Sequence, residues 1–178
     1  AEIQKRILAK KEELDKIFSH VTFETNGSPV QVAILGCGDK RFISGHKEIF
    51  EHAPGKPVEI TTFDITIEHL IGEESVFQHD CTLSLPHGPF DITYAHVLLR
   101  FIDTERQWDV IKNSFDALNP DGLAIHVLDT EDYETKTPQL PNGLFSVPLE
   151  VWKMKLDGLE IKHQEIPITY GLAIVIQK

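Results

Sequence analysis

The stretch that decides the fold is VAILGCGD at residues 32–39. Its apolar residues 32–35 are typical of a buried strand, and Gly36 and Gly38 follow directly. Glycine allows a tight turn and lets a ligand approach the backbone closely, and the helix that follows offers free N–H groups. We therefore expect a ligand site at this turn. The alternative is a plain strand-to-helix turn, because Gly-x-Gly alone is weak evidence.

Outward from this turn, strand-like and helix-like segments alternate along the chain. We expect strands at 31–35, 58–63, 75–78, 90–95 and 123–128. We expect helices at 2–20, 45–52, 67–71, 104–118 and 144–156. Such alternation predicts an α/β fold with a parallel sheet. The final strands 159–168 and 172–177 are joined by only three residues, a connection that permits only an antiparallel hairpin.

Composition limits the class of protein. The 178 residues suit a single domain, 1–178, and 41% hydrophobic with 25% charged residues is typical of a soluble globular protein. No apolar run approaches the roughly 20 residues of a membrane helix. The net charge of −11 repels phosphate backbones, which disfavours a nucleic-acid partner.

Cysteine and histidine usage limit the chemistry. Cys37 and Cys81 lie in candidate site loops and form no disulfide framework, so we expect a reducing, cytoplasmic location. The charged, polar start of the chain is unlike a secretory signal. Nine histidines invite a metal hypothesis, but no tight ligand pair such as H-x-x-x-H or C-x-x-C is present, so we expect no metal site.

Two carboxylates follow neighbouring strands of the expected sheet. Asp64 ends the second strand, where a carboxylate can accept two hydrogen bonds from a ribose diol. The alternative role of Asp64 is a helix N-cap. Asp80 lies in the loop after the third strand and can accept a hydrogen bond from an exocyclic amine such as that of adenine. The alternative there is an ordinary polar loop. A third glycine of a dinucleotide fingerprint is missing, because Arg41 stands in its place.

These features come in a characteristic order. The glycine turn, Asp64, the Asp80 loop, FDITYAH at 90–96 and ALNPDGL at 117–123 together resemble the class I S-adenosylmethionine-dependent methyltransferases. The resemblance covers about residues 31–128, and the final hairpin is similar to the last two strands of that family. It implies a Rossmann-like methyltransferase fold, with a mostly parallel seven-stranded sheet, helices on both faces and a C-terminal antiparallel hairpin.

The resemblance also implies a cofactor, S-adenosylmethionine, and a set of residues that bind it. The glycine turn would lie against the methionine part, Asp64 would hold the ribose hydroxyls, and Asp80 would bind the adenine amine. The implied cofactor-binding residues are Gly36, Cys37, Gly38, Asp64, Ile65, Asp80, Cys81 and His96. The implied activity is methyl transfer to a small-molecule or protein acceptor.

Methyl transfer requires a catalytic base only if the acceptor must lose a proton. His96, at the end of the fourth strand, is the first candidate for that base, and Asp129 and Tyr133, after the fifth strand, are the next. His96 could instead cap a helix or line a polar cleft. The polar segment 127–143 lies where the family often places substrate-recognition elements.

Two positions depart from the family pattern. Ile34 stands where an acidic residue is usual, Lys40 stands where a third glycine is frequent, and Lys40 and Arg41 add positive charge. These departures support two alternatives: a catalytically inactive binding or regulatory domain, and a domain that binds a phosphorylated ligand at the turn. The N-terminal helix, 1–20, would cover one face of the sheet or act as a lid.

Overall fold

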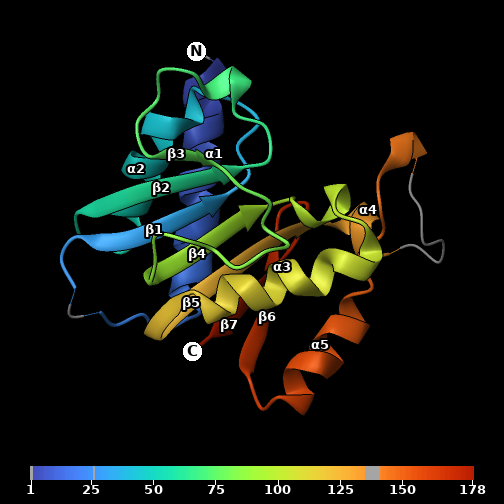
Figure 1. Cartoon of the computed structure of the whole chain (residues 1–178). Helices are drawn as coiled ribbons and strands as arrows, with labels where there is room; N and C mark the ends of the chain where they lie inside the picture. Colours follow the sequence, from blue (N-terminus) through green and yellow to red (C-terminus); the bar gives the residue numbers. More distant parts are fainter. Residues whose placement is uncertain (1, 26, 135–140) are drawn as a thin grey trace.

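The computed structural model describes residues 2–25, 27–134 and 141–178. They form a seven-stranded sheet in the order β3-β2-β1-β4-β5-β7-β6 (Figure 1). The strands are β1 (Val30–Leu35), β2 (Val58–Asp64), β3 (Val76–Gln78), β4 (Phe90–His96), β5 (Leu118–Asp129), β6 (Lys162–Ile168) and β7 (Gly171–Gln177). The first five strands are parallel to one another, and β7 is antiparallel to both β5 and β6. This arrangement confirms the predicted sheet and hairpin.

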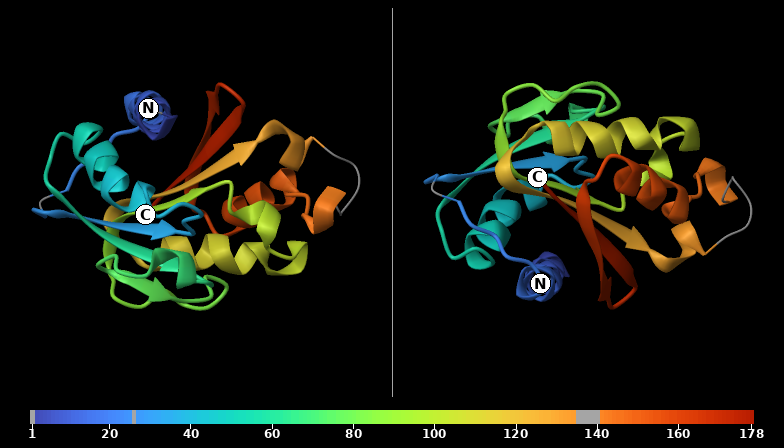
Figure 2. Two further views of the ribbon diagram at one scale, coloured as in Figure 1. Left: turned by 90° about the horizontal axis from the view of Figure 1, so that it is seen from above. Right: turned by 90° about the horizontal axis from the view of Figure 1, so that it is seen from below.

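Helices cover both faces of the sheet, as predicted. They are α1 (Glu2–Ser19), α2 (Phe42–His52), α3 (Thr104–Asp116), α4 (Thr130–Tyr133) and α5 (Leu149–Gly158), with the 3₁₀ turns η1 (Glu68–Leu70), η2 (Leu99–Phe101) and η3 (Pro141–Gly143). Figure 2 shows α1 and α2 on one face and α3 and α5 on the other. Each face has its own hydrophobic core.

The apolar run of β1 explains its central place. Val32 and Ile34 pack into the core under α1 and α2, whereas Ala33 and Leu35 pack into the core under α3 and α5. Successive side chains of a strand point to opposite faces, so a strand buried on both faces must be apolar throughout. The glycine turn is thereby held rigidly at the carboxyl edge of the sheet.

Several predicted boundaries were wrong. The strand expected at 123–128 begins five residues earlier, at Leu118, and residues 119–122 lie inside β5 as an irregularity between the pairs Phe90–Leu118 and Ile92–Leu123. The helix expected from residue 144 begins at Leu149, after Pro148. Proline lacks an N–H and disfavours a helical residue before it.

The strand expected at 159–168 and three of the expected helices also differ in length. The strand predicted from residue 159 begins at Lys162, because the N–H of Leu159 still bonds to α5 and Glu160 has a left-handed φ of 56°. Helix α2 starts at Phe42, three residues before the predicted start at 45, and the helix expected at 67–71 is the shorter 3₁₀ turn η1. α3 ends at Asp116, two residues before the expected end at 118.

Candidate functional site

A cleft of about 380 Å³ opens at the carboxyl edge of the sheet, between the segments that follow β1, β2, β3 and β4. Its volume lies within the range of about 300–1,000 Å³ that is typical of small-ligand sites. The eight residues implied for cofactor binding all line it: Gly36, Cys37, Gly38, Asp64, Ile65, Asp80, Cys81 and His96. The carboxyl ends of adjacent parallel strands meet at one edge, which brings residues far apart in sequence into one cleft.

The glycine turn has the geometry that requires glycine at its first position. Gly36 adopts a φ of +86°, and its N–H donates to the carbonyl oxygen of Phe63 at 2.7 Å. A Cβ at position 36 would also come within 3.2 Å of Leu98. A Cβ at Gly38 would meet no atom within 4 Å, so the backbone there borders open space. The turn thus presents a bare backbone to the cleft.

Asp64 ties the glycine turn to β2. Its Oδ2 accepts a hydrogen bond from the Cys37 N–H at 2.7 Å, and its Oδ1 accepts one from the Thr66 N–H at 3.0 Å. The next turn, η1, has Ile67 as its N-cap, so Asp64 is not the predicted alternative, a helix cap. Each carboxylate oxygen has two lone pairs, so both oxygens retain the capacity to accept a further hydrogen bond from a ligand.

Asp80 is held by its own loop. Its Oδ1 accepts hydrogen bonds from the hydroxyl of Thr82 at 2.7 Å and from the N–H of Thr82 at 2.9 Å. These two bonds lower the pKa of Asp80, so the group is a carboxylate at neutral pH. Both bonds go to Oδ1, and among the described residues Oδ2 has no hydrogen-bond donor. A ligand amine would find a free acceptor at Oδ2.

The two cysteines form part of the cleft floor. Cys81 is 8% exposed, and burial raises its pKa to about 12. Cys37 is also buried, and burial raises the pKa of its thiol. Because the thiolate is the nucleophilic form, neither cysteine is poised for covalent chemistry.

Apolar side chains, most of them from outside the predicted set, complete the walls of the cleft. Ile65, which was predicted, and Phe101, which was not, are each 64% exposed although they are large and hydrophobic. Leu98 and Ile102 line the cleft beside Phe101. Leu98, Phe101 and Ile102 belong to the apolar segment after His96, which is too short for its pattern to predict a secondary structure. Exposed apolar surface within a cleft is what a flat, apolar ligand group would cover.

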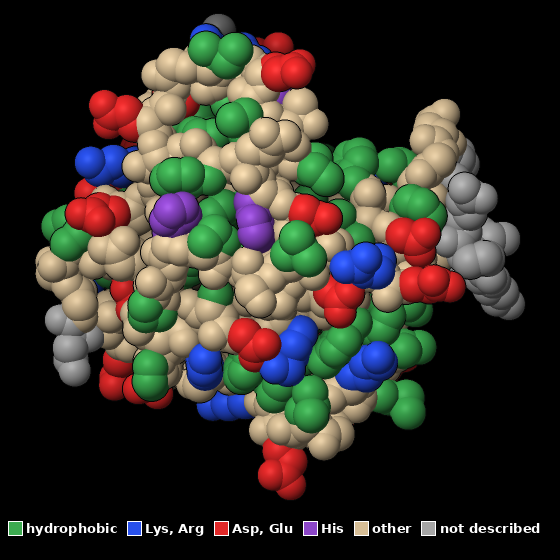
Figure 3. All heavy atoms as spheres, in the orientation of Figure 1, with side chains coloured by type: hydrophobic (Ala, Val, Ile, Leu, Met, Phe, Trp, Pro, Cys, Tyr) green, Lys and Arg blue, Asp and Glu red, His purple; other side chains and the backbone are tan. Residues whose placement is uncertain are grey.

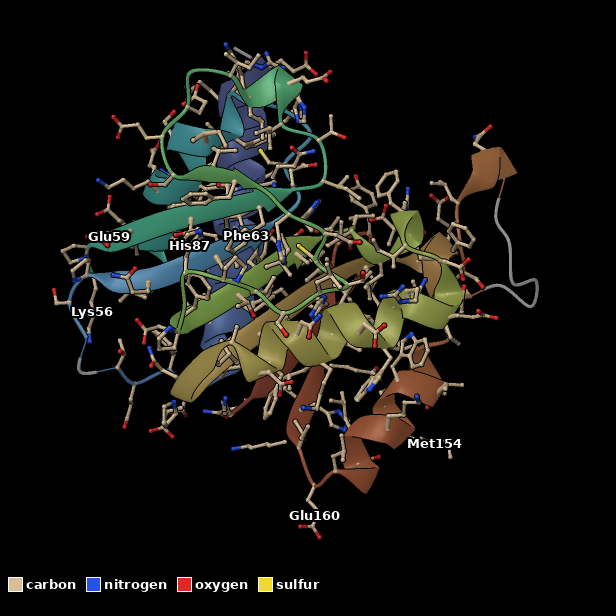
Figure 4. The ribbon with its side chains drawn as sticks, viewed as in Figure 1. Lys56, Glu59, Phe63, His87, Met154 and Glu160 are labelled. Carbon is tan, nitrogen blue, oxygen red and sulfur yellow. The ribbon has the colours of Figure 1, made fainter. Side chains whose placement is uncertain are left out.

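Phe63 at the end of β2 extends this wall beyond the cleft. The rings of Phe63 and His87 stack with centroids 6.3 Å apart, and Figure 4 shows the two side chains next to each other. His79, which also lines the cleft, packs against the ring of Phe63, with centroids 5.5 Å apart. The histidines of this loop therefore have a packing role. Among the described residues, no group of three or more His, Cys, Asp or Glu side chains is arranged to hold a metal ion.

The three catalytic candidates lie in different surroundings. His96 ends β4, lines the cleft and has a side chain that is 36% exposed. Asp129 does not line the cleft and forms an ion pair with Arg100 at 2.8 Å. Tyr133, on α4, is partly buried against the core under α3 and α5. The structure thus brings His96, but not Asp129 or Tyr133, into the cleft wall. Residues 135–140 of the expected substrate-recognition segment lie outside the described residues.

Two charged residues of the glycine turn, Asp39 and Arg41, are engaged with each other. Arg41 donates to Asp39 at 2.7 and 3.1 Å, and Arg6 of α1 lies 3.6 Å from the same carboxylate. The hydrogen bonds from Arg41 lower the pKa of Asp39 to about 2. Lys40 and Arg41 do not line the cleft, and this geometry weakens the case for a phosphate site. Ile34 is 1% exposed and belongs to the core.

The surface shows no concentration of basic side chains on the face drawn in Figure 3, where acidic and basic side chains are interspersed. Within the described ranges, no helix combines the length and the apolar character needed to cross a bilayer.

Solved structures give the fold its class. The chain matches an amino pentose methyltransferase from Micromonospora echinaspora, solved with S-adenosylmethionine bound, with a TM-score of 0.69 and 11% identity over 99% of this chain and 95% of that one. It matches an S-adenosylmethionine-dependent methyltransferase from Clostridium acetobutylicum with a TM-score of 0.66 and 9% identity, over 97% and 91% of the two chains. The protein has the fold of the class I S-adenosylmethionine-dependent methyltransferases.

A third match is with a longer protein. It covers 94% of this chain but only 56% of an O-methyltransferase family protein from Burkholderia thailandensis, with a TM-score of 0.62 and 12% identity. The chain therefore spans about half the length of that protein. No protein-family model matches the sequence, and no curated protein matches it.

Proposed function

We propose that the protein binds S-adenosylmethionine in the cleft at the carboxyl edge of its sheet and transfers the methyl group to a small-molecule or protein acceptor. The observation that carries this proposal is the lining of the cleft. All eight residues that the sequence implies for the cofactor meet there, in a volume suited to a small ligand.

The chemistry of the lining fits the parts of the cofactor. Asp64 retains lone pairs for the two ribose hydroxyls, and Asp80 has a free carboxylate oxygen for the adenine amine. Ile65 and Phe101 supply exposed apolar surface for the adenine ring. The bare backbone at Gly38 leaves room for the methionine part.

When bound, S-adenosylmethionine supplies a sulfonium methyl group, and the protein's contribution is chiefly to hold an acceptor in line with it. His96 is our candidate in the cleft wall for the group that accepts a proton from the methyl acceptor. Burial lowers its pKa to about 3, with the charges of Lys10 and Arg6 as further causes, so in the ligand-free protein the imidazole is neutral near pH 7 and is a weak base. A neutral imidazole has a free lone pair for a proton.

One structural neighbour, an amino pentose methyltransferase, supports a small-molecule methyl acceptor. Two of the structural neighbours are an amino pentose methyltransferase and an O-methyltransferase family protein. The net negative charge of this chain repels phosphate backbones and so disfavours a nucleic-acid acceptor. We therefore favour a small molecule or a protein side chain as acceptor.

A second candidate function is a methyltransferase-like domain that binds a partner without catalysis. The observation that favours it is Ile34, buried in the core where a carboxylate would otherwise be expected near the amino end of the cofactor. The same cleft would then bind the cofactor weakly or not at all. The two candidates differ in one measurable quantity, the affinity for S-adenosylmethionine.

Calorimetric titration with S-adenosylmethionine and, separately, with S-adenosylhomocysteine tests the proposal. We expect micromolar binding that Asp64→Asn weakens strongly. Asp116→Asn, on α3 and ion-paired with Lys112, is the matched control and should leave binding unchanged. A folded sample that binds neither compound at millimolar concentration would overturn the proposal and favour the binding domain. Equal weakening by both substitutions would place the ligand outside this cleft.

A further inference from the structure

Helix α1 places a carboxylate beside the cleft histidine. Oε1 of Glu13 lies 3.7 Å from Nε2 of His96. The side chain of Glu13 is 21% exposed, and Oε1 itself is buried and receives no hydrogen bond from the described residues. A buried carboxylate oxygen without a donor is costly for stability, by about 1–3 kcal/mol. Such an oxygen at the edge of a ligand cleft suggests a role other than packing.

The apolar packing of α1 does not require Glu13, whose carboxylate also lies near the buried ammonium group of Lys10 on the same helix. The helix is anchored by Ile7, Leu14 and Ile17, which are buried in the core that α1 covers. Glu13 is adjacent to this apolar stripe, where a neutral side chain would pack without the cost of burying a charge. Burial accordingly raises the pKa of Glu13.

The charged and titratable groups around His96 come from every element packed against it. They are Arg6, Lys10 and Glu13 of α1, His46 of α2, Tyr94 of β4, Arg100 of η2 and, next to Glu13, Asp129 at the end of β5. The cations oppose a positive charge on the imidazole. Asp129 is paired with Arg100, so Glu13 is the carboxylate that faces the ring nitrogen.

We propose that Glu13 is a positioning residue for His96: its carboxylate orients the imidazole and stabilises the imidazolium that forms when His96 takes a proton from the methyl acceptor. This inference rests on the proposed function. It makes α1 part of the active site and not only a cover for the sheet. The separation of 3.7 Å is too long for a hydrogen bond, but catalytic hydrogen bonds are often long before substrate binds.

The chemistry can be written with all atoms in place. An oxygen of the acceptor forms a bond to the methyl carbon, the carbon–sulfur bond breaks, and its electron pair returns to sulfur. The acceptor's proton moves to the lone pair of a His96 ring nitrogen. With the ring proton on Nε2, toward Glu13, that lone pair is on Nδ1. The new positive charge on the ring then faces the carboxylate of Glu13.

The test measures which nitrogen of His96 carries the proton, by nitrogen NMR of the ligand-free protein with isotope-labelled histidine, at mildly alkaline pH. His96→Gln identifies the resonances. We expect the Nε2–H form to predominate in the wild-type protein and this preference to be weaker in Glu13→Leu, where only the intrinsic preference of histidine for Nε2–H remains. Glu12→Leu, one residue away on the exposed side of α1, should retain it. Glu13→Asp should restore part of it.

A merely structural role of Glu13 would leave the ring tautomer unchanged, so an Nδ1–H form in the wild-type protein, or equal spectra of the wild-type protein and Glu13→Leu, would overturn the inference. Loss of the preference in Glu12→Leu as well would also overturn it. The result is independent of cofactor binding. An unchanged tautomer in a protein that binds S-adenosylmethionine refutes Glu13 alone. A shifted tautomer in a protein that binds no cofactor refutes the proposed function, and the catalytic role of Glu13 with it.

Discussion

The carboxylate of Asp64 and the backbone N–H of Cys37 are joined by a hydrogen bond of 2.7 Å that links the end of β2 to the glycine turn after β1. The residue proposed to hold the ribose therefore also shapes the turn proposed to face the methionine part. Because one carboxylate has both roles, a substitution at this position should change stability and binding together.

Asp64→Ala tests this double role. It leaves the N–H groups of Cys37 and Thr66 without their acceptor, and we expect the free energy of unfolding to fall by about 1–3 kcal/mol. Urea unfolding with an unchanged m-value would measure the loss. Asp64→Asn keeps an oxygen acceptor and should lose less stability while still weakening cofactor binding. Equal stability of Asp64→Ala and the wild-type protein would show that the two bonds contribute little.

Gln107 supports the apolar wall of the cleft from behind. It is fully buried on α3, and its Nε2 donates to the carbonyl oxygens of Leu99 and Ser146, each at 3.0 Å, while its Oε1 accepts from the indole N–H of Trp152 at 3.1 Å. These bonds hold η2, the turn that carries Phe101, against α3 and α5.

We expect Gln107→Leu to lower the free energy of unfolding by about 3 kcal/mol, because it leaves several buried polar groups without partners. It should also weaken cofactor binding by loosening η2. Thermal unfolding and calorimetry would measure the two effects. The exposed Gln4→Leu is the control. A Gln107→Leu protein as stable as the control would contradict this account.

The sequence predicted the part of the site that follows from sheet topology. Gly36, Asp64, Asp80 and His96 each follow a parallel strand, so their meeting at one edge required only the strand order. Phe101 and Glu13 could not be placed in this way. Their positions depend on how η2 and α1 pack onto the sheet, and neither local pattern nor spacing contains that information.

The same reasoning explains the position of Asp129. The sequence placed it just after a strand of the cleft edge, and it does end β5. However, β5 pairs with the antiparallel β7 as far as Gly171, and Arg100 from η2 binds the Asp129 carboxylate. Its catalytic role, like those of His96 and Tyr133, stays a prediction.

His126 gives the protein a pH-dependent stability. It is 3% exposed on β5, its Nε2 lies 2.8 Å from the hydroxyl of Ser114, and burial lowers its pKa from 6.5 to about 4. The unfolded chain then binds a proton more readily than the folded protein. The contribution of His126 to the free energy of unfolding is complete above pH 6.5 and is lost as the pH falls toward 4, by up to about 3 kcal/mol. Denaturant unfolding at several pH values across this range would measure the free energy of unfolding. Its slope against pH should be shallower in His126→Gln than in the wild-type protein. The exposed His20→Gln should keep the wild-type slope, and an unchanged slope in His126→Gln would contradict the assignment.

Phe101 separates ligand binding from stability more cleanly than any carboxylate of the cleft. Phe101 is 64% exposed, so little of its apolar surface is removed from water on folding. Phe101→Ala should therefore change the free energy of unfolding by no more than about 0.5 kcal/mol. If the ring covers the adenine group, the same substitution should weaken S-adenosylmethionine binding about tenfold, a loss of about 1.4 kcal/mol. Tyr170→Ala, 80% exposed in the β6–β7 turn and away from the cleft lining, should change neither quantity. Unaltered binding by Phe101→Ala would mean that the adenine ring lies elsewhere, whereas a large loss of stability would mean that Phe101 packs more tightly than its exposure indicates.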